Sequence, residues 1–162
     1  MSEVIMPLRA LSHFLDISKV PYRSYNHPPT YSAQDTARLM HISGHEVAKT
    51  VILRLDGRLV MAVLPACEMV DLDKFHDMAG AMWVELADED DLEHIAPLCD
   101  AGSIPPIGNL FGLPVYVSVS LALDETIAFN AGNHTEEIRM YFRDFERLVQ
   151  PRVMDFSRAH WQ

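Results

Sequence analysis

Residues 50–64 read TVILRLDGRLVMAVL, and this stretch decides the fold. Two apolar runs flank Asp56-Gly57, and an Asp-Gly pair between such runs is the strongest short-range signal of a β-hairpin. The second run is apolar at consecutive positions, without strict alternation. A strand of this kind is typical of the centre of a sheet that is covered on both sides.

The first strand of this hairpin extends back through Lys49. A period of two places Lys49 on the same face as Val51, Leu53 and Leu55. The chain has only three lysines, so it is unusual that one of them follows an apolar row. Either Lys49 reaches past the beginning of the strand to water, or it points into a pocket that needs a fixed positive charge.

Helices and strands follow one another irregularly around the hairpin. Helical spacing begins at Leu8, Ser32 and Asp71 are placed to cap two further helices, and acidic residues 88–91 open another. Further strands are predicted at 22–27, 82–86, 113–120, 125–132 and from 136, the last merging into a closing helix. The order predicts one compact mixed α+β domain over residues 1–162, with a central mixed, largely antiparallel sheet surrounded by helices.

Composition restricts the function. The chain has 162 residues, 49% of them hydrophobic, and no apolar run approaches the roughly 20 residues that span a bilayer. It carries 13 Lys and Arg against 23 Asp and Glu, a formal charge of −10, which argues against a protein that coats nucleic acid. Four arginines crowd the C-terminal quarter, and we interpret them as part of a solvated, patchy surface: Arg139, Arg143, Arg147 and Arg152.

Cysteine and histidine usage favours a protein without a metal. Cys67 and Cys99 show no metal or redox spacing, which favours a reduced, cytoplasmic protein. Among eight histidines, His41 and His45 are four apart, but Gly44 lies between them and no Glu follows His41. Surface or hydrogen-bonded histidines are therefore the favoured interpretation. The common nucleotide-binding and hydrolase motifs are absent.

Three weak features together suggest a pocket. Lys49 is the first. The second is GSIPPIG, residues 102–108, in which Gly102 and Gly108 let the backbone approach a ligand or adopt positive φ, and the prolines stiffen the loop. Its remaining N–H groups suit a carbonyl or phosphate oxygen. The third is His134 in the polar turn of FNAGNHTEEI, residues 129–138. Taken singly, the second feature is explained by a rigid turn and the third by a hairpin turn.

These residues lie within a longer pattern that resembles the YbaK/prolyl-tRNA-synthetase-associated domain family, whose members edit aminoacyl-tRNA. The resemblance covers nearly the whole chain in the right order. Its parts are HPPTYSAQDTA at 27–37, EVAKTVILRLDGRLVMAVLPACEMVDL at 46–72, GSIPPIGNLFGLPVYV at 102–117 and FNAGNHTEEIRMYFRDFERLV at 129–149. The lysine that opens the strand and the G-x-x-x-P loop are its most specific elements.

The resemblance implies a YbaK-like domain that hydrolyses the ester of mischarged tRNA without a cofactor. Lys49 corresponds to the family's essential lysine, and the loop that holds the substrate corresponds to Gly102, Ser103, Ile104, Pro105 and Pro106, with Gly108 just beyond. His134 is a looser match to a pocket histidine, and Thr30 and Tyr31 line the entrance. The implied partners are the acceptor end of aminoacyl-tRNA and an aminoacyl-tRNA synthetase, with no membrane and no DNA.

The chemistry agrees with these residues. Ester hydrolysis needs a held carbonyl, a stabilised oxyanion and an activated water. No protein base is evident, and the resemblance suggests that a ribose hydroxyl of the terminal adenosine helps to activate the water. A small pocket with Ile104 and Ile107 as walls would select a small cargo such as alanine, serine, cysteine or proline, because one methylene is worth only about 1–3 kcal/mol to a synthetase.

Two other interpretations remain open. The same pocket in a non-catalytic module would bind a nucleotide or an aminoacyl group, as a sensor or a synthetase partner. Alternatively, some of the eight histidines would build a metal-dependent hydrolase. Turnover of an aminoacyl ester separates the first from an enzyme, and elemental analysis tests the second.

Overall fold

The computed structural model describes residues 7–159, so the ends of the predicted 1–162 domain, residues 1–6 and 160–162, lie outside it. The predicted hairpin is present: β2 (Ala48–Leu55) pairs antiparallel with β3 (Arg58–Pro65), and Leu55 opposes Arg58 across the turn. Asp56 and Gly57 both have positive φ, 49° and 85°. This is the backbone that a two-residue hairpin turn requires and that Asp-Gly adopts readily.

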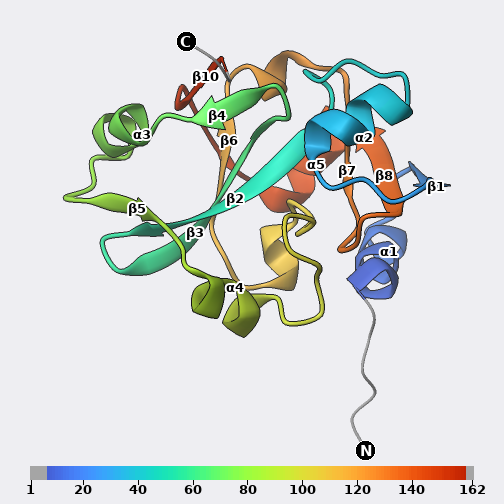
Figure 1. Ribbon diagram of the computed structural model, residues 1–162, viewed down its shortest axis with the longest axis horizontal. Helices are drawn as coiled ribbons and strands as arrows, with labels where there is room; N and C mark the ends of the chain where they lie inside the picture. The colour runs from blue at the N-terminus through green and yellow to red at the C-terminus, as the bar shows by residue number, and fades with distance from the viewer. Residues whose placement is uncertain (1–6, 160–162) are drawn as a thin grey trace, which may run out of the picture.

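The hairpin is the centre of a five-stranded sheet in the order β5-β2-β3-β6-β9 (Figure 1). β5 (Val84–Leu86) adds antiparallel to β2, whereas β6 (Val115–Ser118) and β9 (Arg152–Met154) continue the sheet in parallel beyond β3. The central strand β3 packs on both faces, with Met61 and Val63 on one side and Val60, Ala62 and Leu64 on the other. Its continuous apolar run is thereby explained.

Two smaller sheets complete the strand arrangement. β1 (Tyr22–Asn26), β8 (Glu136–Tyr141) and β7 (Thr126–Asn130) form an antiparallel sheet in that order, and β4 (Glu68–Val70) pairs with β10 (Ser157–Ala159). An isolated parallel bridge between Val47 and Ala128 joins the lysine strand to β7. The amide of Ala128 donates to the carbonyl of Glu46, 2.9 Å away.

Three of the described helices, α2, α3 and α4, begin at a residue whose side chain caps them. Their bounds are α1 Pro7–Ile17, α2 Ala33–Leu39, α3 Leu72–Ala79, α4 Glu89–Ile95 and α5 Phe142–Val149, with short 3-10 turns at Gly108–Leu110 and Leu121–Leu123. The Ser32 and Asp71 side chains accept from backbone N–H groups three residues ahead, as predicted. Asp88 and Asp91 form a capping box on α4. None of the described helices is long and apolar enough to cross a membrane.

The principal core lies between the five-stranded and three-stranded sheets. α1 contributes Leu11 and Leu15, α5 contributes Phe142 and Phe145, and both sheets contribute alternate residues. A second cluster, around Phe75 of α3 and Phe156, covers the opposite face of β2 and β3. The predicted mixed fold class is confirmed. The three-residue strands β4, β9 and β10 were missed, because segments this short carry no readable period.

Gly108 provides a direct test of the packing next to the 102–106 loop. A Cβ added at Gly108 would lie 2.3 Å from the carbonyl oxygen of Leu113, which is backbone and cannot move aside cheaply. We expect Gly108→Ala to lower the free energy of unfolding by about 1–3 kcal/mol, the usual cost of overpacking. Urea unfolding of the two proteins measures the difference, and an unchanged midpoint would contradict the close packing.

Candidate active site

Lys49 lies near the start of β2, on the face that packs toward α3. Its Cα is paired with Leu64, and its Nζ donates to the carbonyl of Ala66 at 3.4 Å. Burial lowers the pKa of Lys49, while the nearby Cys67 and Glu68 oppose that shift. A half-buried ammonium held by one carbonyl keeps donors free for a ligand.

The side chain of Lys49 lines a cavity of about 820 Å³. The other lining residues are Val51, Met69, Val70, Asp71, Leu72, Asp73, Leu86 and Arg158. Arg158 supplies a second cation, although Asp71 lies 3.8 Å from its Nε. The cavity is within the size range of small-molecule sites and combines apolar walls with a few charges. This answers the question that the sequence raised: Lys49 borders a cavity and is not fully extended into water.

A polar cluster adjoins Lys49 at the turn between β3 and β4. Ligand atoms of His45, Cys67 and Glu68 all lie within 4.8 Å of one another, and His45 Nδ1 is 3.4 Å from Cys67 Sγ. Glu68 Oε1 accepts a hydrogen bond from Ser120 at 2.8 Å and a second from Ser157. Such a set is chemically able to bind zinc, but burial and Glu68 raise the pKa of the Cys67 thiol, which opposes the thiolate that a metal needs.

The sequence did not identify this cluster, because spacing alone does not bring residue 45 beside residues 67 and 68. Asp124 is a further acidic group beside this cluster. Burial of its carboxyl, and then the nearby Glu46, raise the pKa of Asp124 to about 6. The neighbourhood of Lys49 therefore contains a cation beside several acidic groups. An arrangement of this kind suits a ligand that carries both an anionic or carbonyl group and an ammonium group.

The 102–106 loop is held from within. Ser103 is fully buried, and both its backbone N–H and its hydroxyl donate to the Asp100 carbonyl, at 3.1 and 2.7 Å. Gly102 has φ of 77°, and Pro105 and Pro106 are buried. Within residues 7–159, the N–H groups of Gly102 and Ile104 have no backbone acceptor, so these two remain for a ligand oxygen. Gly108, in contrast, is required for close packing against Leu113.

Three of the predicted segments are brought together. The Gly132 N–H donates to the Ser103 carbonyl at 3.0 Å, which ties the loop to the turn that carries His134. The Thr30 N–H donates to the His134 carbonyl at 3.1 Å, and the rings of Tyr31 and His134 have centroids 5.4 Å apart. Thr30 is buried and Tyr31 is 80% exposed.

Lys49 approaches these segments from another direction. Ile107 and Ala131 pack in the principal core, whereas Lys49 is on the opposite face of β2. The link is the parallel bridge between Val47 and Ala128, after which β2 and β7 run in the same direction. Lys49 comes two residues after Val47, and the turn at 131–134 begins three residues after Ala128, just beyond the end of β7. The predicted site residues line four separate cavities: one contains Lys49, one Pro105, one Thr30, and the fourth both Gly102 and Ile104.

A buried carboxyl lies behind the histidine turn. Glu137 is fully buried on β8, with Nε2 of His27 3.4 Å away and the amide group of Asn130 2.6 and 3.2 Å from its two oxygens. Burial raises the pKa of Glu137 to about 8. The proton that it holds at neutral pH lets it share a hydrogen bond with the imidazole of His27. The sequence did not single out Glu137, because an acid in an alternating strand is usually exposed.

Comparisons with known proteins identify the family and the fold. A family model described as the aminoacyl-tRNA editing domain matches residues 27–148. The multifunctional Ser/Thr-tRNA deacylase ProXp-y of Escherichia coli (strain K12) is 28% identical over 118 residues, which are 69% of this chain and 70% of that protein.

Solved structures share the fold at low identity. One, described as a candidate trans-editing enzyme for prolyl-tRNA synthetase, superposes with a TM-score of 0.83 at 16% identity, covering 97% of this chain and all of that one (100%). A hypothetical protein gives a TM-score of 0.82 at 18% identity over 91% of this chain and 99% of that chain. The family resemblance seen in the sequence is confirmed. The family model matches residues 27–148, which are more than half of this chain, and the chain therefore belongs to the aminoacyl-tRNA editing domain family.

Proposed function

We propose that this protein is a trans-editing aminoacyl-tRNA deacylase, which hydrolyses the ester between a small amino acid and the wrong tRNA. The family match carries this proposal, because residues 27–148 contain the lysine, the loop and the histidine turn. The reaction adds the oxygen of water to the ester carbonyl carbon and breaks the bond to the ribose oxygen. That oxygen takes a proton, which leaves free amino acid and tRNA.

In this proposal Lys49 and residues 102–106, which line separate cavities, contact different parts of one substrate. Lys49 donates from its cavity to a phosphate or ribose oxygen of the acceptor end, or polarises the carbonyl. The N–H groups of Gly102 and Ile104 stabilise the oxyanion. Glu68, close to Lys49, suits the cationic α-amino group of the cargo. The vicinal ribose hydroxyl of the terminal adenosine helps to activate water.

The cargo is proposed to be seryl or another small aminoacyl group. The Escherichia coli relative is described as acting on Ser- and Thr-tRNA, and serine is among the small residues that the sequence favours. Nδ1 of His134 is buried and has no hydrogen-bond partner among the described residues. A buried polar atom of this kind is normally paired, and a cargo hydroxyl is a suitable partner after a small rotation of the ring. The proposed partners are the tRNA acceptor end and a synthetase that releases the mischarged product.

Deacylation of a panel of preformed aminoacyl-tRNAs tests this function. The panel contains seryl-, threonyl-, alanyl- and cysteinyl-tRNA, with leucyl- and phenylalanyl-tRNA as large cargos and correctly matched pairs as controls. We expect a small mischarged cargo to be hydrolysed at least about tenfold faster than the large ones, the discrimination that one or more methylenes provide. Equally fast hydrolysis of leucyl or phenylalanyl esters would refute the small pocket.

A binding module is the alternative that the same geometry permits. It predicts that the purified protein binds aminoacyl ligands through Lys49 but hydrolyses none of the panel. The panel therefore decides between an enzyme and a sensor in one experiment.

A further inference from the structure

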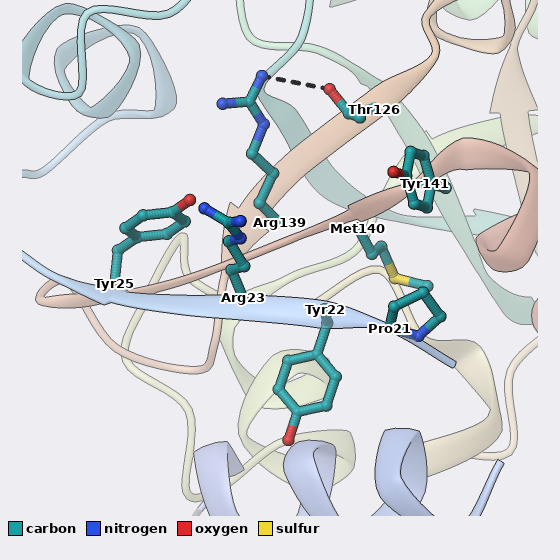
Figure 2. A pocket seen from close by; sticks show the side chains of 8 residues that line it. All are labelled: Pro21, Tyr22, Arg23, Tyr25, Thr126, Arg139, Met140 and Tyr141. Atoms are coloured by element: carbon teal, nitrogen blue, oxygen red, sulfur yellow. Dashed lines mark hydrogen bonds between the residues drawn. The ribbon is translucent and has the colours of Figure 1, made fainter. Parts of the chain in front are cut away.

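A fifth cavity lies on the three-stranded sheet. Figure 2 shows its side chains on β1, β8 and the start of β7. Its volume is about 400 Å³. The lining residues are Pro21, Tyr22, Arg23, Tyr25, Thr126, Arg139, Met140 and Tyr141. They include two arginines, three tyrosines and no acidic residue, in a chain whose formal charge is −10.

The two arginines oppose each other across neighbouring strands. Arg23 of β1 is the direct cross-strand partner of Arg139 of β8. Like charges in this position repel and destabilise a sheet, unless a counter-charge lies between them. Arg139 donates to Glu46 at 3.1 Å and to Thr126 Oγ1 at 3.3 Å. Arg23 is exposed, and within residues 7–159 no carboxylate lies within 4.0 Å of its guanidinium.

The positions of these groups suit a phosphate. Figure 2 shows Arg23, Tyr25 and Arg139 rising from the same side of the sheet, whereas Tyr22 points the other way, where its hydroxyl donates to Asp16 of α1 at 2.8 Å. Guanidinium groups bind phosphate oxygens through paired N–H donors. A phosphate between Arg23 and Arg139 would relieve their repulsion and satisfy both.

Tyrosines beside the arginines supply surfaces for bases. Tyr25 is half-buried next to Arg23, and Tyr141 is 37% exposed at the other end of the cavity. Arg143 lies over the Tyr141 ring, 4.8 Å from its centroid, and adds a third cation. Aromatic rings next to backbone-binding cations are the recurring design of surfaces for single-stranded nucleic acid.

We propose that this arginine–tyrosine cavity binds the RNA strand of the tRNA substrate, with a phosphate between Arg23 and Arg139 and a base against Tyr25. The assignment rests on the proposed function, since that function makes RNA the partner. It also gives a role to Arg139 and Arg143, which the sequence left as surface charge.

The cavity is connected to the lysine strand. Arg139 is paired with Glu46, three residues before Lys49. This ion pair places the cavity beside the segment that leads into the lysine strand.

Binding of uncharged tRNA tests the assignment. Fluorescence anisotropy at several salt concentrations compares the wild type with Arg23→Ala and Tyr25→Leu. Arg58→Ala, which removes an exposed arginine from the β2–β3 turn, is the matched control. We expect Arg23→Ala to raise Kd about tenfold and to lower the slope of log Kd against log salt by about 1, as for the loss of one phosphate contact. Tyr25→Leu should raise Kd and leave the slope unchanged.

The outcomes separate the role of the cavity from the deacylase activity. Equal affinity and salt slope for wild type, Arg23→Ala and Arg58→Ala would overturn the assignment, and so would the absence of tRNA binding by the wild type. Arg23→Lys, which keeps the charge, should retain most of the affinity and thereby exclude misfolding as the cause. Uncharged tRNA contains no ester, so weakened binding by Arg23→Ala would support the cavity even if no ester in the panel were hydrolysed.

Discussion

Lys49→Ala is expected to lower the rate constant for deacylation by about 100-fold or more, a loss typical when a preorganised donor is removed from an ester-hydrolysing site. The ammonium is half-buried, is hydrogen-bonded to Ala66 and borders a cavity whose other cation, Arg158, is paired with Asp71. Single-turnover hydrolysis of the mischarged tRNA that the wild type prefers measures the effect.

Two variants separate the charge of Lys49 from its packing. Lys49→Met keeps the length and apolar stem of the side chain and should be as inactive as Lys49→Ala. Lys19→Ala removes an exposed lysine after α1 and should retain wild-type turnover. Full activity of Lys49→Met would show that the side chain serves only to pack against β3, and the proposed role of its charge would be wrong.

Glu137→Gln is expected to change how stability depends on pH. The folded protein keeps the Glu137 proton up to a pKa of about 8, because its carboxyl is buried, whereas the unfolded chain releases it near the ordinary value of 4.5. Between these values the folded state binds more protons, so the contribution of Glu137 to stability falls as pH rises, by up to about 1.4 kcal/mol per unit. Gln cannot ionise, so the variant should gain stability relative to the wild type from pH 5 to pH 8.

Urea unfolding of both proteins at each pH gives this difference. Glu93→Gln, at an exposed position on α4, accounts for the loss of one carboxyl from an acidic chain. A difference that stays constant from pH 5 to pH 8 would contradict the protonated carboxyl. It would mean instead that Glu137 is ionised in the fold and forms an ion pair with His27.

Local sequence signals predicted the parts of the fold that local physics determines. Asp56-Gly57 specified the central hairpin, because few other pairs adopt positive φ twice in succession. Ser32 and Asp71 specified two helix starts through hydrogen bonds that span three residues. The apolar row through Val51 and Leu53 also gave the face on which Lys49 lies.

The parts that were missed depend on contacts between distant residues. β4 and β10 pair across almost ninety residues, and this pairing brings Ser157 to Glu68. Glu137 alternates along β8 like any solvated acid, and its burial follows from His27 and Asn130, which other strands deliver. The sequence likewise contains Arg23 and Arg139 far apart, and only the β1–β8 register makes them neighbours.

The bridge between Val47 and Ala128 bears on where local opening would be most costly. Through that contact, the strand that carries Lys49 is continuous with the sheet that encloses the principal core. Local unfolding there would expose the core and cost nearly as much as global unfolding. The segments at 28–31 and 102–106 lie outside the strands. If these segments hold the cargo, as proposed, any adjustment to its size is expected there rather than in the strand that carries Lys49.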